Sequence, residues 1–220
     1  MNAKSPIPSQ LSPTLELCVC RPGPDLTDAE FRSALRSADD FLSTQAGFEG
    51  REVLYSSSAD RWIDLIHWAS PQAAEAAMAA FAGVEALQPL ATRLVDVTML
   101  QLARLPDLAC SGKTAERRAT GAVPVYEIIT YRLKPGAAVD LFSRRLEAFG
   151  AALAALDGFE RRDVFVDGAS GTWAEIVRYA DQHAVDRLGP IAMSLPEAAA
   201  AMECIEEASV EIRFATEAPK

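Results

Sequence analysis

The sequence predicts an α+β protein that is built from two copies of one β-α-β-β-α-β unit. Three observations lead to this prediction: a long internal repeat, the same order of strand and helix patterns in each copy, and a polar segment between the copies. The 220 residues are enough for two domains of about 100 residues each. With 50% apolar and 24% charged residues, the composition is that of an ordinary globular chain.

The repeat is clearest in residues 47–70 and 158–181, which align without a gap at a spacing of 111 residues. Such a repeat indicates a tandem duplication. We place a flexible tail at residues 1–13, the copies at 14–104 and 124–216, and a linker at 105–123. The identical pairs are Gly47/Gly158, Phe48/Phe159, Glu49/Glu160, Arg51/Arg162, Val53/Val164, Trp62/Trp173 and Ala69/Ala180.

Each copy shows the same order of elements. The first strand alternates apolar and polar residues, as in Val125–Leu133, and it ends at a Pro-Gly turn. An amphipathic helix follows, and then a hairpin whose second strand carries the tryptophan. A second helix begins at Pro71 with Ser70 as its N-cap, and the last strand spans residues 94–102. This is the order of the ferredoxin-like (βαββαβ) fold.

Each sheet would have one face covered by its own helices, so its second face also needs burial. We therefore expect the two ferredoxin-like units to pack sheet to sheet.

Charge and hydropathy narrow the classes of function. A net charge of −10 and a pI of about 4.7 disfavour nucleic acid and anionic membranes as partners. We find neither a membrane-spanning stretch nor a secretory signal, so we expect a cytoplasmic protein with reduced cysteines. Cys18 and Cys20 would share one strand face, where we expect small buried side chains rather than metal ligands. We predict no metal and no cofactor.

The third strand of each copy carries the candidate site, because alternate residues of a strand share one face. Flat aromatic walls suit a planar ligand, and a half-buried carboxylate between them could act as a base with a raised pKa. Alternatively, the aromatic residues are core and each acid pairs with an arginine such as Arg51 or Arg162. We expect both Trp62 and Trp173 to be largely buried. The candidates are Trp62, Asp64 and Trp68 in the first copy and Trp173, Glu175 and Tyr179 in the second.

A further candidate is His67, which lies on the opposite face of the same strand and has Arg178 as its counterpart. Its side chain titrates near neutral pH, which suits acid–base catalysis. The alternative is a hydrogen-bonded histidine near the interface between the copies. The other histidine, His183, falls near a helix start, where we expect it to be exposed and without a functional role.

These patterns resemble one known superfamily. A strand that ends in Pro-Gly, a helix, Gly-Phe before a hairpin, and Trp-Ala-Ser (68–70) before an Ala-rich helix are similar to the dimeric α+β barrel proteins. The antibiotic-biosynthesis-monooxygenase-like group is the nearest, followed by the stress-responsive barrel proteins. The resemblance covers nearly the whole chain, once per copy. In that superfamily two single-domain subunits pair, so the resemblance implies an internal pair here. It leaves further homodimerisation open.

The resemblance also implies a pocket between each sheet and its helices. Some members oxidise aromatic polyketides with O2 and no cofactor, some cleave haem, and many have no known activity. Monooxygenase-like members often carry an acid and a helix histidine at slots that here hold Ile66 and Val177, and Ala77 and Leu188. We expect a protein that binds a small apolar or aromatic molecule. A cofactor-independent monooxygenase-like enzyme and a non-catalytic binding or structural module are the two alternatives.

Overall fold

The computed structural model describes residues 13–112 and 122–218. Contacts divide these residues after Ala103 into a first unit and a second unit. Residues 1–12 of the predicted tail and residues 113–121 of the predicted linker lie outside the described residues. No helix in the described part of the chain is long and apolar enough to cross a membrane.

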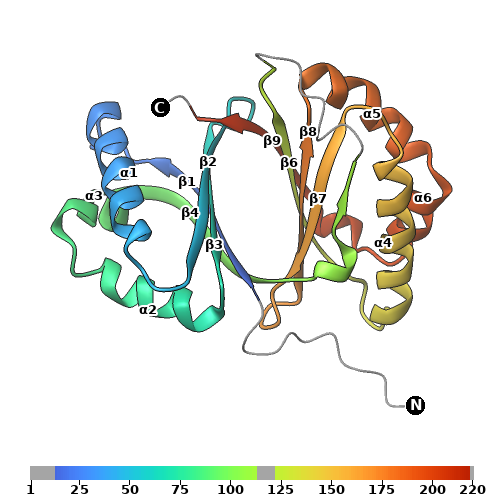
Figure 1. Cartoon of the computed structure of the whole chain (residues 1–220), viewed down its shortest axis with the longest axis horizontal. Coiled ribbons are helices and arrows are strands. Elements are labelled where there is room, and N and C mark those ends of the chain that lie inside the picture. The colour runs from blue at the N-terminus through green and yellow to red at the C-terminus, as the bar shows by residue number, and fades with distance from the viewer. Residues whose placement is uncertain (1–12, 113–121, 219–220) are drawn as a thin grey trace. The chain divides into compact units, whose positions relative to one another are not determined.

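The first unit has the expected element order, and its helices lie along one face of its sheet (Figure 1). The sheet order is β4-β1-β3-β2, and each neighbouring pair of strands is antiparallel. The elements are β1 (Thr14–Pro22), α1 (Asp28–Ser43), β2 (Phe48–Ser56), β3 (Arg61–Trp68), α2 (Pro71–Phe81), the 3-10 turn η1 (Glu85–Leu87), α3 (Gln88–Thr92) and β4 (Leu94–Arg104).

The second unit repeats this arrangement in the order β9-β6-β8-β7, with the short strand β5 on β7. Part of the predicted linker is therefore structured, because Cys110 and Ser111 pair with β7. The elements are η2 (Pro106–Leu108), β5 (Cys110–Ser111), β6 (Val125–Arg132), α4 (Val139–Ala154), β7 (Phe159–Val166), β8 (Thr172–Tyr179), α5 (Gln182–Ser194), α6 (Pro196–Met202), η4 (Glu207–Ser209) and β9 (Glu211–Glu217).

The spacing of 111 residues in the sequence is also the spacing of equivalent positions in the two units. Ser70 caps α2 by accepting a hydrogen bond from the Ala73 amide, and Asp181 caps α5 in the same way. The local backbone conformation explains why both copies have a glycine before the hairpin. Gly47 has a φ of 79° and Gly158 a φ of 95°, in the left-handed region that favours glycine.

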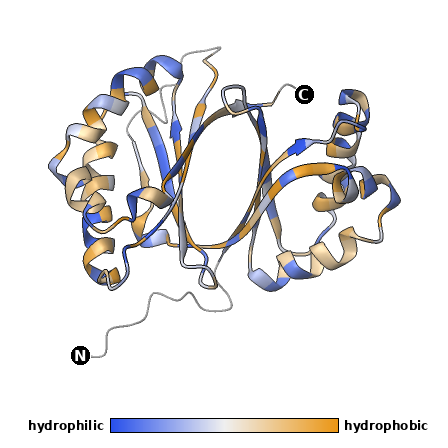
Figure 2. Cartoon of the chain, turned by 180° about the vertical axis from the view of Figure 1, so that it is seen from behind, coloured by the Kyte–Doolittle hydropathy of each residue, from blue (hydrophilic) through white to orange (hydrophobic). Residues whose placement is uncertain are grey.

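Both units contain buried apolar clusters. Figure 2 shows apolar segments along the strands of both units, alternating with polar ones. In the first unit, one buried cluster gathers Trp68, Leu42, Ala74 and Ala77. In the second unit, one cluster lies around Trp173 and Phe142 and another around Tyr179 and Phe159.

Candidate ligand-binding site

The first unit contains a cavity of about 490 Å³, lined by residues of its sheet and its helices. This volume lies within the range of about 300–1,000 Å³ that is usual for small-molecule sites. The aromatic lining residues are Phe31, Phe41, Trp62, Trp68 and Phe81. The polar lining residues are Glu16, Cys18, Cys20, Arg51 and Asp64.

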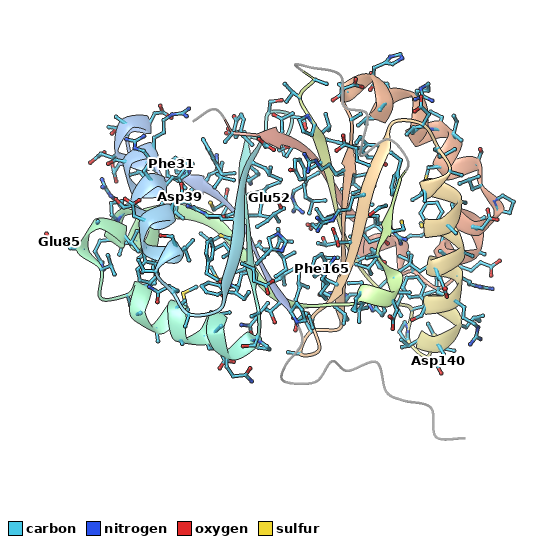
Figure 3. All side chains as sticks on the ribbon, viewed as in Figure 1. Phe31, Asp39, Glu52, Glu85, Asp140 and Phe165 are labelled. Carbon is cyan, nitrogen blue, oxygen red and sulfur yellow. The ribbon has the colours of Figure 1, made fainter. Side chains whose placement is uncertain are left out.

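The structure brings the three candidates of the first copy, Trp62, Asp64 and Trp68, to this one cavity. Trp62 packs edge to face on Phe31 of α1, with 4.8 Å between the ring centroids; Phe31 is labelled in Figure 3. Trp68 is fully buried. Trp62 faces the cavity and is less completely buried than Trp173.

Asp64 is held in an ion pair with Arg51. Both carboxylate oxygens accept from Arg51 Nε, at 2.9 and 3.0 Å, and Oδ2 also accepts from Nη2 at 2.6 Å. Arg51 Nη1 donates to the Leu35 carbonyl and to Asp39 Oδ1, which fixes the guanidinium between β3 and α1. The structure therefore shows the alternative in which the acid of the third strand pairs with an arginine. Asp64 is not an isolated base.

A second carboxylate in the cavity, that of Glu16 on β1, was not among the predicted residues. Glu16 is 7% exposed, and its Oε2 accepts a hydrogen bond of 2.8 Å from Trp68 Nε1. Burial raises the pKa of Glu16; the Trp68 hydrogen bond opposes this rise and the charge of Asp64 adds to it. The sequence from Leu15 to Cys20, Leu-Glu-Leu-Cys-Val-Cys, could have indicated this position, because alternate residues of a strand share one face and Glu16 therefore lies on the same face as Cys18 and Cys20.

The two thiols beside Glu16 interact with each other. A hydrogen bond between them raises the pKa of Cys18 and lowers that of Cys20, which accepts it. All four cysteines are free. Among the residues that the structure describes, no group of three or more His, Cys, Asp or Glu side chains is placed to hold a metal ion.

The cavity does not fit a haem held by histidine, because no histidine lines it. Ala77 stands at the helix position where monooxygenase-like members of the superfamily often carry a histidine. His67 does not line the cavity. Its Nε2 lies 3.3 Å from Glu52 Oε2, and Figure 3 shows Glu52 on the side of β2 away from α1. His183 belongs to α5 of the second unit. The structure thus does not bring either histidine to this site.

The three candidates of the second copy lie in a closed core instead. Trp173, Glu175 and Tyr179 are all buried. Glu175 accepts from Arg162 Nε and from the Tyr131 hydroxyl, both at 2.6 Å. Burial raises the pKa of Tyr131 well above its usual value, which keeps the hydroxyl protonated and donating. This second pair is therefore a core ion pair, as the alternative interpretation predicts.

At three of the equivalent positions, 111 residues apart, the second unit has a much larger side chain than the first. The three smaller residues of the first unit all line the cavity. Among their counterparts in the second unit, Tyr131 and Leu188 are buried, and Phe149 packs against two core clusters. The larger side chains occupy the space that is open in the first unit. The pairs are Cys20 and Tyr131, Ala38 and Phe149, and Ala77 and Leu188.

No family model and no curated protein matches the sequence. Solved structures match nearly the whole chain. A "putative monooxygenase" from Lactobacillus acidophilus is 13% identical, with a TM-score of 0.64 and coverage of 93% of both chains. An anthrone oxidase-like protein is 10% identical, with a TM-score of 0.67 over 94% of this chain and 92% of its own. Chlorite dismutase from Candidatus Nitrospira defluvii, in complex with imidazole, is 11% identical, with a TM-score of 0.63 over 96% and 93%.

At these identities the likeness establishes the fold. The order of elements in both units and the near-complete coverage of each matched chain agree with it. The chain therefore has the fold of the dimeric α+β barrel superfamily, as a tandem of ferredoxin-like units.

Proposed function

We propose that the first unit binds a small, mainly apolar and aromatic molecule in its cavity. The observation that carries this proposal is the cavity of about 490 Å³ with five aromatic side chains in its lining. Three of these five positions are also aromatic in the second unit, where Phe142, Trp173 and Tyr179 are packed in its core. Such a pocket, with a few polar groups converging on it, is the usual form of a small-molecule site.

The arrangement of the rings supports a planar ligand. Phe41 of α1 and Phe81 of α2 meet edge to face, with ring centroids 6.0 Å apart. Trp62 and Trp68 line the cavity from β3. Rings presented from several elements offer both faces and edges, which suits the offset and edge-to-face contacts that aromatic groups prefer.

The chemistry at this site has two candidates. One is cofactor-independent oxidation of an aromatic ligand, which the monooxygenase-like and anthrone oxidase-like names of the structural neighbours support. The other is binding without catalysis, which the pairing of Asp64 with Arg51 favours because it occupies the predicted base. Measuring oxygen consumption in the presence of each phenolic compound that binds would distinguish oxidation from binding alone.

We also propose that the protein is cytoplasmic, where its free thiols stay reduced.

Calorimetric titration with naphthylmethanol, a neutral two-ring alcohol, tests the binding proposal. We expect the natural protein to bind it and Ala77→Leu to bind at least about tenfold more weakly, because the new side chain occupies cavity space as Leu188 does in the second unit. The control is Ala79→Leu on the same helix, at an exposed position outside the lining, which should bind as the natural protein does.

Tryptophan emission gives a second readout, since two of the three tryptophans line the cavity. Ligand binding should shift the emission of the natural protein, and the shift should be lost in Ala77→Leu. Absence of binding to the natural protein, or equal binding by Ala77→Leu, would contradict the proposal.

A further inference from the structure

We infer that the ligand of this cavity carries a protonated amine, which the carboxylate of Glu16 anchors. The inference rests on the proposed function, because it names the chemical class of the same ligand. It starts from a carboxylate that is nine-tenths buried and lines an otherwise mostly apolar cavity.

The charges around the cavity do not balance within the unit. Arg51 is the cation of the lining, and its guanidinium is bound by Asp64 and Asp39. Within the described ranges 13–112 and 122–218, Glu16 has no ion pair. A buried carboxylate without a cation is unfavourable, whereas a charge that is paired and hydrogen-bonded is tolerated. A cationic ligand would supply the missing partner.

The geometry leaves room for that partner on Glu16. Trp68 Nε1 donates to Oε2 at 2.8 Å, which orients the carboxylate. Among the described residues, no hydrogen bond reaches Oε1, so this oxygen is free to accept from a ligand. An ammonium group at Oε1 would form a charge-assisted hydrogen bond, and the neighbouring indole of Trp68 adds a favourable surface for a cation.

The second unit provides an internal control for this arrangement. Glu127 stands at the position equivalent to Glu16, and its Oε2 accepts from the Tyr179 hydroxyl at 2.8 Å. Tyr179 belongs to a packed core cluster. An acid beside an aromatic donor is therefore common to both units, and only the one in the first unit faces the cavity.

The test is calorimetric titration of the full chain at pH 7 with three compounds that share one ring system: naphthylmethylamine, naphthylmethanol and naphthoate. We expect the amine to bind at least about tenfold more tightly than the alcohol, since hydrogen bonds to charged groups are the stronger ones, and naphthoate to bind most weakly. This ranking is measured on the natural protein and needs no variant.

Glu16→Gln sharpens the test, because glutamine keeps an acceptor for Trp68 Nε1 and removes the charge. We expect amine affinity to fall at least about tenfold and alcohol affinity to change by less than about twofold. Glu127→Gln is the matched control and should leave both affinities unchanged. Circular dichroism and urea unfolding verify that each variant is folded.

The outcomes separate this inference from the binding proposal. If the alcohol binds and the amine binds no more tightly, or if Glu16→Gln binds the amine as the natural protein does, the anchor is refuted and the cavity proposal stands. Such a result would fit a protonated Glu16 that donates to a neutral oxygen. If none of the three compounds binds, both the anchor and the proposed function fail.

Discussion

In the first unit Arg51 holds Asp64 beside an open cavity, whereas in the second unit Arg162 holds Glu175 within a closed core. The ring contacts next to these pairs are nearly the same, with centroid distances of 4.8 Å for Phe31–Trp62 and 5.0 Å for Phe142–Trp173. The backbone, the arginine–acid pair and the ring contact are thus common to both units. The difference lies in the volume of a few neighbouring side chains.

The same difference alters the surroundings of the two ion pairs. The side chain of Asp64 is 19% exposed, and Cys20 stands where the second unit has a tyrosine. The side chains of Arg162 and Glu175 are 0% and 6% exposed, and Tyr131 donates to the remaining carboxylate oxygen. A filled core therefore removes water from the second pair, whereas the cavity leaves the first pair open to solvent or ligand.

The largest expected effect comes from breaking the ion pairs. Arg162→Met should lower the free energy of unfolding by about 3–5 kcal/mol, because it leaves the buried Glu175 without a cation. Arg51→Met should lower it by about 1–3 kcal/mol, because Asp64 remains partly exposed. Urea unfolding at pH 7 measures both, and equal losses would contradict the difference in burial.

A smaller effect concerns the pH dependence of the first unit. Burial raises the folded-state pKa of Glu16 above the ordinary value of 4.5, so the folded state retains this proton to a higher pH than the unfolded state does. The contribution of Glu16 to stability therefore decreases as pH rises from 4.5 through the folded-state pKa. Glu16→Gln lacks this loss, so its free energy of unfolding should rise relative to the natural protein across that range.

Urea unfolding at several pH values from 4 to 7 measures this pH effect. The control is Glu75→Gln on the exposed side of α2, which should follow the pH profile of the natural protein. Parallel profiles for Glu16→Gln and the natural protein would contradict a raised pKa at this position.

The fold and part of the site could be predicted because their signals are local. The repeat and the two-residue period of β3 sufficed to place Trp62, Asp64 and Trp68 on one face. The sequence did not predict that Glu16 lines the cavity, because a glutamate in an alternating strand resembles a solvent-facing residue. Its burial depends on the pairing of β1 with β3, which sets Glu16 opposite Ile66.

The sequence pattern did not identify the copy that contains the cavity. Trp62 and Trp173 occupy equivalent positions of the repeat and have equivalent ring partners. Of the two, Trp62 lines the cavity and Trp173 is packed in a core cluster. That outcome depends on the summed volume of side chains from several elements, including Ala38 and Ala77. Period and spacing determine which face a residue occupies, but not how completely that face is filled.

The first unit is hollow at Ala77 and packed at nearby Ala74, and two substitutions on α2 test this difference most directly. Ala77 and Ala74 are both buried, but only Ala77 lines the cavity. Urea unfolding should show that Ala77→Leu keeps the free energy of unfolding within about 1 kcal/mol or raises it, because the added carbons enter open apolar space. Ala74→Leu should lower it by about 1–3 kcal/mol through overpacking. Equal destabilisation by both substitutions would contradict the cavity.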